Sequence, residues 1–258
     1  MASRNPVLIR ATGETLGQGQ TTQTTAAPAG FGTSALMTMD DVIVKTGILF
    51  VVLVAGAFFG WNTAESNGSI VFISMIVGLV LGLTNTFKRN VSPALVLAYG
   101  VAEGVFLGGI SKYFDLAYAE KAPQIVSQAV IGTLTTFGVM LVLYRTNVIK
   151  VNAKFMKIFT IAMASYFVIA LASFVAGAFF KTGGGWGFYG VGQIGLLLCA
   201  VGVALAAFSL VMDFELITQG VQSGLPEKES WRMAFGLTVT LVWLYTEILR
   251  LLAILNER

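Results

Sequence analysis

The sequence contains no histidine, a single cysteine and few charged residues. Lysine and arginine number 16, aspartate and glutamate 13, and histidine none. The lack of histidine excludes Ser-His-Asp and Cys-His nucleophile arrangements, His-based zinc sites and the usual pH-responsive side chain. The lone Cys199 has no partner for an intrachain disulfide or a thiolate metal cluster, so we interpret it as a buried apolar residue. Any pH sensing or cation chemistry must therefore depend on carboxylates.

Apolar residues are abundant. Hydrophobic residues make up 56% of the 258 residues and charged residues 11%, whereas an average soluble domain has about 25% charged residues. A transmembrane helix needs about 20 mainly apolar residues, so this apolar share is enough for about seven helices. The composition predicts an all-α, polytopic protein that spans the lipid bilayer with seven helices. The net charge of +3 is too small and dispersed to indicate binding of nucleic acid.

Apolar runs separated by short breaks rich in turn residues place the helices. The expected ranges are 46–62, 69–87, 92–113, 125–146, 155–180, 189–212 and 231–255. The sixth helix is also compatible with an extension past Asp213 toward Gly220. Residues 1–40 include a Thr-, Gln-, Ala- and Gly-rich stretch, which predicts a disordered cytoplasmic tail before a transmembrane domain at 41–258.

The distribution of lysine and arginine predicts the orientation. Positively charged residues near membrane helices are enriched on the cytoplasmic side. Eleven of them fall in segments on the side of the N-terminus and four on the other side, so we expect a cytoplasmic N-terminus and an outer C-terminus in the cell (inner) membrane. The first group is Arg4, Arg10, Lys45, Lys88, Arg89, Arg145, Lys150, Lys154, Lys157, Lys228 and Arg232, and the second is Lys112, Lys121, Lys181 and Arg258.

Glycines recur at four-residue spacing on the first three predicted helices. Small residues with this spacing let transmembrane helices approach closely, which favours a compact bundle. The stripes consist of Gly56 and Gly60, of Gly78 and Gly82, and of Gly100, Gly104 and Gly108.

Five ionisable residues fall at or near membrane depth, where each costs about 2.5–3.5 kcal/mol at the bilayer centre. Glu103 lies mid-helix beside the third glycine stripe and is either a pathway carboxylate or a hydrogen-bonding partner of a neighbouring helix. Glu247 and Arg250 are three residues apart, so they either pair with each other or Arg250 extends to the outer interface. Asp213 is a candidate site residue, whereas Glu215 is typical of a helix end.

The last two predicted helices carry a resemblance to a known family. The segments Phe208–Glu215, Trp231–Gly236 and Trp243–Leu252, together with Ala102-Glu103-Gly104, resemble the Bax inhibitor-1 family, also called the transmembrane Bax inhibitor motif family. The similarity is greatest to its bacterial YccA-like branch and extends from about residue 40 to the end of the chain.

The resemblance implies six helices around a central seventh and a pH-sensitive calcium leak controlled by two acids. By this resemblance the acids are Asp213 and Glu247, which would share a proton in one state and weakly bind Ca²⁺, the transported ion, in another. No tightly bound cofactor is implied. The resemblance also suggests a counter-charge on the second helix, where the nearest candidates are Lys88 and Arg89 at its end; Arg250 is a further candidate.

Two features of the sequence depart from the family pattern. Glu247 stands where the family usually has aspartate. A hairpin turning near Leu225 would also leave Asp213 and Glu247 about 15 Å apart along continuous helices. Direct pairing therefore requires a non-helical or cytoplasm-protruding stretch between 216 and 230, and otherwise Glu103 and Glu247 are the better pair.

Other functions compete with a cation leak. The run Val54–Phe59 recurs as Val175–Phe180, which is the kind of echo that repeats in transporters leave and motivates a proton-coupled small-solute carrier. The glycine stripes also allow a non-conducting regulator that binds partner membrane proteins. An intramembrane aspartyl protease would need a Gly-x-Gly-Asp element, which is absent, so we expect no enzyme.

Overall fold

A computed structural model describes residues 35–185 and 187–256, and its helices account for most of them. Each of the seven α-helices is long and apolar enough to cross a membrane, which confirms the predicted all-helical seven-span fold. They are α2 (Met39–Thr63), α3 (Gly68–Phe87), α4 (Pro93–Ala117), α5 (Ile125–Arg145), α6 (Ala153–Phe180), α7 (Gly192–Gln222) and α8 (Glu229–Asn256), with short 3₁₀ turns η1 (Thr182–Gly185) and η2 (Gly187–Gly190) between α6 and α7.

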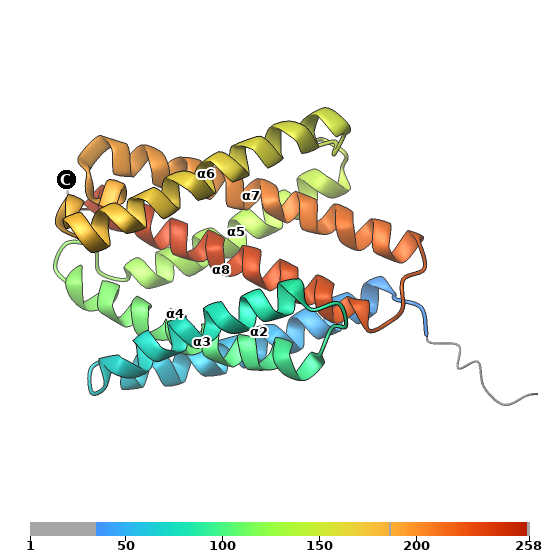
Figure 1. The fold of residues 1–258 in the computed structure, drawn as a ribbon, viewed down its shortest axis with the longest axis horizontal. Coiled ribbons are helices and arrows are strands. Elements are labelled where there is room, and N and C mark those ends of the chain that lie inside the picture. Colours follow the sequence, from blue (N-terminus) through green and yellow to red (C-terminus); the bar gives the residue numbers. More distant parts are fainter. Residues whose placement is uncertain (1–34, 186, 257–258) are drawn as a thin grey trace, which may run out of the picture. The chain divides into compact units, whose positions relative to one another are not determined.

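The last helix, α8, lies at the centre of the bundle. It packs against α2, α4, α5 and α7, and it runs between α2, α3 and α4 on one side and α5, α6 and α7 on the other (Figure 1). In the most apolar stretch of α8, 50% of the residues are buried, whereas in the most apolar stretch of α6 only 11% are buried. The central seventh span implied by the resemblance is therefore present, and α6 is the most peripheral helix.

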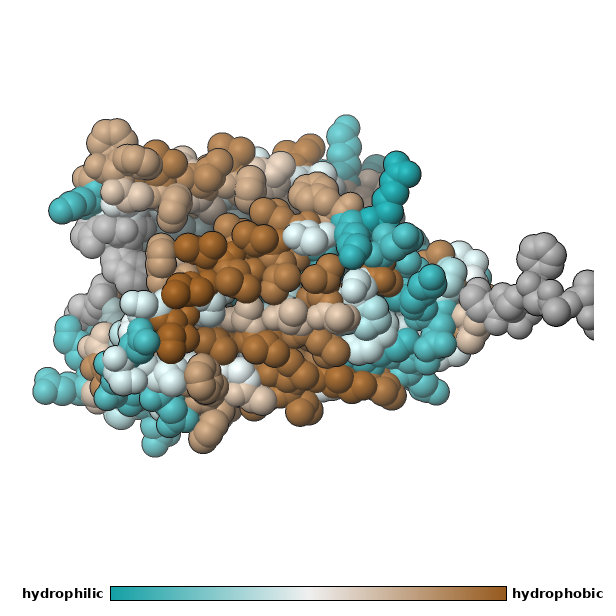
Figure 2. Space-filling model, turned by 60° about the horizontal axis from the view of Figure 1, so that its bottom comes forward, coloured by the Kyte–Doolittle hydropathy of each residue, from teal (hydrophilic) through white to brown (hydrophobic). Residues whose placement is uncertain are grey.

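The surface carries an apolar band between hydrophilic ends. In Figure 2 hydrophobic side chains cover the middle of the helices, and hydrophilic side chains gather toward both ends of the bundle. Many of the exposed side chains in the band are large, including Phe72, Leu79 and Phe58. Exposed apolar surface of this extent is stable in a lipid environment, as expected for a multi-pass membrane protein.

Glycines bring α2 and α4 into backbone contact. A Cβ atom on Gly56 would lie 2.8 Å from the carbonyl oxygen of Val101. A Cβ on Gly60 would collide with the carbonyl of Val105, and one on Gly108 with the carbonyl of Ala57. These positions tolerate no side chain without separating the helices. The predicted stripes on the first and third spans are therefore confirmed, and they face each other.

The first helix begins at Met39, seven residues earlier than predicted. Thr38 is its N-cap: the Asp41 amide donates to Thr38 Oγ1 at 3.1 Å, and the Thr38 amide donates to Asp41 Oδ2 at 2.9 Å. This reciprocal capping box begins the helix at Met39. Asp40 and Lys45 make the first turns polar, so a prediction from apolar runs begins the helix too late.

The predicted tail at 1–40 is too long at its C-terminal end. Residues 1–34 lie outside the described residues, but the segment just after them is folded. The Met37 amide donates to the Leu225 carbonyl at 2.7 Å, and the Met37 side chain is buried. The transmembrane domain therefore includes residues 35–40, because this segment packs on the turn between α7 and α8.

We predict that Gly60→Ala destabilises the bundle. The added methyl group collides with the Val105 backbone, and overpacking of this kind costs about 1–3 kcal/mol. The measurement is the thermal unfolding midpoint of the purified protein in detergent, which should fall by several degrees. Gly47→Ala, on the same helix with open space around the new methyl group, is the control and should be neutral or slightly stabilising. Equal midpoints for the two variants would contradict the α2–α4 contact.

Candidate functional site

The three candidate carboxyls each face a glycine of the neighbouring helix. A Cβ on Gly202 of α7 would lie 2.9 Å from Glu247 Oε2 of α8. A Cβ on Gly236 of α8 would lie 3.9 Å from Asp213 Oδ1 of α7, and a Cβ on Gly78 of α3 would lie 2.6 Å from Glu103 Oε2 of α4. The missing side chains at Gly78 and Gly202 leave room for the carboxyl groups of Glu103 and Glu247, whereas a Cβ at Gly236 would make only ordinary contact with Asp213.

The α7–α8 contacts define one antiparallel register, and this register keeps Asp213 and Glu247 apart. Asp213 lies opposite Gly236, and Glu247 is 11 residues further along α8, or about 16 Å. α7 remains helical to Gln222 and α8 begins at Glu229, so the non-helical stretch is far shorter than direct pairing requires. The extension of the sixth span past Asp213 is thus present. The shared carboxyl site for one weakly bound Ca²⁺ is not assembled.

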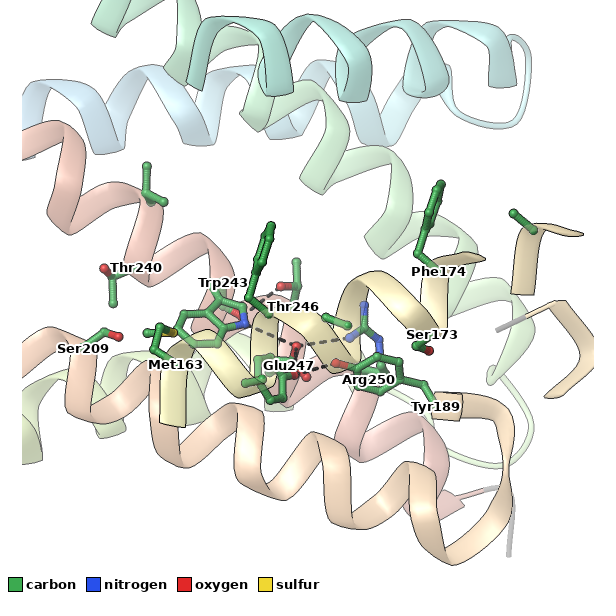
Figure 3. A pocket seen from close by; sticks show the side chains of 15 residues that line it. Met163, Ser173, Phe174, Tyr189, Ser209, Thr240, Trp243, Thr246, Glu247 and Arg250 are labelled. Atoms are coloured by element: carbon green, nitrogen blue, oxygen red, sulfur yellow. Dashed lines mark hydrogen bonds and ion pairs between the residues drawn. The ribbon is translucent and has the colours of Figure 1, made fainter. Parts of the chain in front are cut away.

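Glu247 is held in a network of aromatic and cationic groups. Its Oε1 accepts hydrogen bonds from Tyr166 Oη at 2.8 Å, Trp243 Nε1 at 3.3 Å and Arg250 Nη1 at 3.2 Å. Tyr189 Oη in turn donates to Tyr166 Oη at 2.7 Å, and the Arg250 guanidinium lies 4.6 Å from the centroid of the Tyr189 ring. Figure 3 shows Trp243, Arg250 and Tyr189 around the Glu247 carboxyl group. The arrangement stabilises one negative charge, because every partner donates to it.

Arg250 is therefore the counter-charge of Glu247, the first of the two arrangements expected from the sequence. The Glu247 side chain is only 4% exposed and that of Arg250 is 30% exposed, so the pair is largely shielded from solvent and lipid. Sequence reasoning missed the aromatic partners. Trp243 lies four residues before Glu247 on the same helix, so its contact with Glu247 could have been predicted from that spacing. Tyr166 belongs to α6, 81 residues away in the sequence, and no local spacing indicates its contact.

Buried oxygens without partners form a row between α7 and α8. Four buried side-chain oxygens among the described residues have no hydrogen-bond partner: Asp213 Oδ2 and Ser209 Oγ on α7, Glu247 Oε2 on α8, and Thr46 Oγ1 on α2. Ser209 and Asp213 lie one turn apart on α7, on the face that also carries Gly202. A buried polar atom without a partner costs about 1–3 kcal/mol. Three such atoms along one helix pair form a track of acceptors suited to water or a cation.

A cavity of about 730 Å³ borders this row. It lies between α6, α7, α8 and η2, with Ser209 and Thr240 toward one end and Arg250 and Tyr189 toward the other (Figure 3). Asp213 is one helical turn beyond Ser209. The volume falls in the range of about 300–1,000 Å³ that is typical of small-molecule sites.

Glu103 lines a different cavity, on the other side of α8. This hollow has a volume of about 330 Å³ and is also lined by Gly78, Tyr99 and Phe235. Val239 of α8 lines both cavities and stands between them. The alternative pair of Glu103 and Glu247 is therefore not formed either, because α4 directs Glu103 toward α3.

The remaining charged candidates lie elsewhere. Glu215 accepts hydrogen bonds from Tyr144 Oη at 3.0 Å and from Gln219 Nε2 at 2.7 Å, inside α7 rather than at its end. Lys88 and Arg89 follow the last residue of α3, where their carbonyls accept from Arg232. Neither forms an ion pair with a described acid. Neither residue is therefore paired with a candidate carboxyl among the described residues, and a role of Lys88 or Arg89 as counter-charge stays a prediction.

Comparison with known proteins yields one family. The sequence profile of the family described as Bax inhibitor 1 like matches residues 5–257. No curated protein matches the chain. The match spans all seven helices and both cavities.

We predict that Arg250→Met destabilises the protein by about 3 kcal/mol, because it leaves the Glu247 carboxylate buried without a counter-charge. Thermal unfolding in detergent measures the effect. Adding Glu247→Gln should restore most of the stability, and Lys181→Met, which removes a charge at an exposed position, is the control. If Glu247→Gln restored no stability to Arg250→Met, this account would be wrong.

Proposed function

The chain belongs to the Bax inhibitor 1-like family, and we propose that it is a pH-sensitive cation leak with Ca²⁺ as the transported ion. The observation that carries the proposal is the row of buried acceptor oxygens of Asp213, Ser209 and Glu247 without hydrogen-bond partners between α7 and α8. A hard cation such as Ca²⁺ prefers oxygen ligands. A row of them inside a membrane domain supports passage of such an ion. The proposal involves no enzymatic reaction.

The spacing of the carboxyls favours successive weak sites over a single strong one. Asp213 and Glu247 are about 16 Å apart along the helices, so one Ca²⁺ contacts them in turn. Each carboxyl supplies at most two of the six to eight oxygens that Ca²⁺ prefers, and water supplies the rest. Conduction requires sites that bind weakly enough to release the ion, which this arrangement provides.

The pH dependence follows from competition for the same oxygens. An ionised carboxyl attracts a cation, and a protonated carboxyl does not. At Glu247 the ion must also displace Arg250, which occupies Oε1 in the structure and blocks that site electrostatically. Flux should therefore be higher at pH 8 than at pH 6. Glu103 is a secondary candidate, because its cavity lies on the opposite side of α8.

Calcium flux into proteoliposomes, with the same pH on both sides, tests the proposal at pH 6 and pH 8. Asp213→Asn and Glu247→Gln should each lower flux at pH 8 about tenfold, equivalent to about 1.4 kcal/mol, and flatten the pH dependence. Glu103→Gln should have a smaller effect. Glu215→Gln, two residues from Asp213 but hydrogen-bonded to Tyr144 and Gln219, is the control and should retain both flux and pH dependence. If Asp213→Asn and Glu247→Gln behave like Glu215→Gln, the proposal is wrong.

A proton-coupled small-solute carrier is a second candidate, favoured by the cavity of about 730 Å³ that places Arg250 and Glu247 beside aromatic walls. Solute counterflow without Ca²⁺ flux would support it over the leak. The third hypothesis, a regulator that binds partner helices through glycine stripes, has less support. Gly56, Gly60 and Gly108 are occupied by contacts within the chain.

The excess of lysine and arginine on one side supports a cytoplasmic N-terminus, with the turn between α7 and α8 on the same side. Thiol labelling tests it, because the native Cys199 is buried. A membrane-impermeant maleimide applied to intact spheroplasts should label Ser66→Cys, between α2 and α3, and should not label Ser223→Cys before permeabilisation. The reverse pattern would show the opposite orientation.

A further inference from the structure

A hollow of about 630 Å³ lies between α2, α4, α5 and α8. Its walls are almost entirely apolar, with Val54 and Phe58 from α2, Val130 and Leu134 from α5, and Val242 from α8. None of the carboxyls of the proposed ion pathway lines it. The hollow, hereafter the α2–α5 groove, is therefore separate from the polar cavity beside α6.

The groove faces the bilayer. α2 and α5 both pack on α8, but they do not pack closely on each other. Side chains from both helices at the groove remain exposed: Phe58 by 73%, Leu134 by 51% and Val130 by 42%. Since the surface around these residues is the apolar band of a membrane domain, the groove is accessible from lipid and lacks a protein cover among the described residues.

The polar atoms in the groove are already satisfied. Ser111 Oγ and Tyr245 Oη share a hydrogen bond of 2.6 Å. Thr133 donates to the Ala129 carbonyl at 2.8 Å, and Thr238 donates to the Ala234 carbonyl at 2.8 Å. None of these groups requires a polar ligand, unlike the oxygens between α7 and α8. The chemistry of the groove suits an apolar chain.

The length of the groove matches one leaflet. Its α2 wall runs over the 13 residues from Phe50 to Asn62, a rise of about 18 Å along a helix. The hydrocarbon core of a bilayer is about 30 Å thick, so one leaflet contributes about 15 Å. A groove of this length accommodates an acyl chain from the middle of the membrane to the interface.

Charged and aromatic residues mark the interfacial end of the groove. Trp61 lines the groove there, and Lys112 Nζ lies 5.1 Å from the centroid of its ring. Lys112 also pairs with Glu65 at 2.9 Å. Tryptophan and lysine are typical of the headgroup level of membrane proteins. An ammonium beside a carboxylate complements a headgroup that carries both a phosphate and an amine.

We propose that the α2–α5 groove binds one acyl chain of a zwitterionic phospholipid from the leaflet next to the α2–α3 turn. The headgroup phosphate lies toward Lys112 and its ammonium toward Glu65. The site is independent of the proposed ion pathway, so its test does not depend on transport.

The unmodified protein provides the first test. It is reconstituted with a phosphatidylethanolamine analogue that carries a diazirine in its acyl chain, irradiated and mapped by mass spectrometry. Adducts at Val54, Val130 and Leu134 should exceed those at Ile131 and Phe72, which are exposed by 64% and 61% outside the groove. We expect about a tenfold excess, the ratio that 1.4 kcal/mol of preference produces. Equal adduct density at groove and control positions would overturn the proposal.

Matched variants provide the second test. Val130→Trp fills the groove and should abolish the excess labelling. Ile131→Trp, at the next residue of α5 and outside the groove, should leave the excess labelling unchanged. Both variant proteins are first checked for monodisperse elution and an unchanged unfolding midpoint. A photoactivatable fatty acid without a phosphate headgroup, used as the second probe, should label the groove several-fold less. Equal labelling by the fatty acid would overturn the assignment to a phospholipid.

Discussion

Glu247 cannot face lipid, and this constraint determines the place of α8 and hence the arrangement of the bundle. A carboxylate in hydrocarbon is costly unless other groups of the protein bind it. Its donors come from α6 and from α8 itself, and Tyr189 of η2 donates in turn to the Tyr166 hydroxyl. α8 also carries buried Thr238 and Thr240, so polar atoms lie on more than one of its faces. A helix of this kind is stable only when other helices surround it, whereas α6, with 11% of its most apolar stretch buried, lies at the periphery.

Glycine serves two purposes in the packing around this centre. Between α2 and α4, Gly60 and Gly108 let one backbone contact another, which matters because lipid provides no hydrophobic force to bring helices together. At Gly78 and Gly202 the same lack of a side chain makes room for a carboxyl group. The first use allows the backbones of α2 and α4 to come into contact. The second admits acidic groups between helices that are otherwise closely packed.

The number and placement of the helices were predictable from the sequence because each span requires a long apolar run. The start of α2 was not, since Asp40 and Lys45 make its first turns polar; the capping pair Thr38 and Asp41 was the available signal. Close helix packing at the glycine stripes was predictable from their spacing, but the pairing of α2 with α4 was not. Contacts between helices that are distant in the sequence were also not predictable, and no local sequence pattern indicates the hydrogen bond from Tyr166 to Glu247.

The separation of Asp213 and Glu247 shows how much a single register determines. Once α7 and α8 are continuous antiparallel helices, the position opposite Asp213 is Gly236, and Glu247 lies three turns further along α8. Eleven residues are close to three full turns, so Asp213 and Gly202, the position opposite Glu247, lie on the same face of α7. The two carboxyls therefore border one helix pair at two depths, with Ser209 between those depths. Acids arranged in this way cannot chelate one ion together, but they can attract the same ion at successive points of its passage.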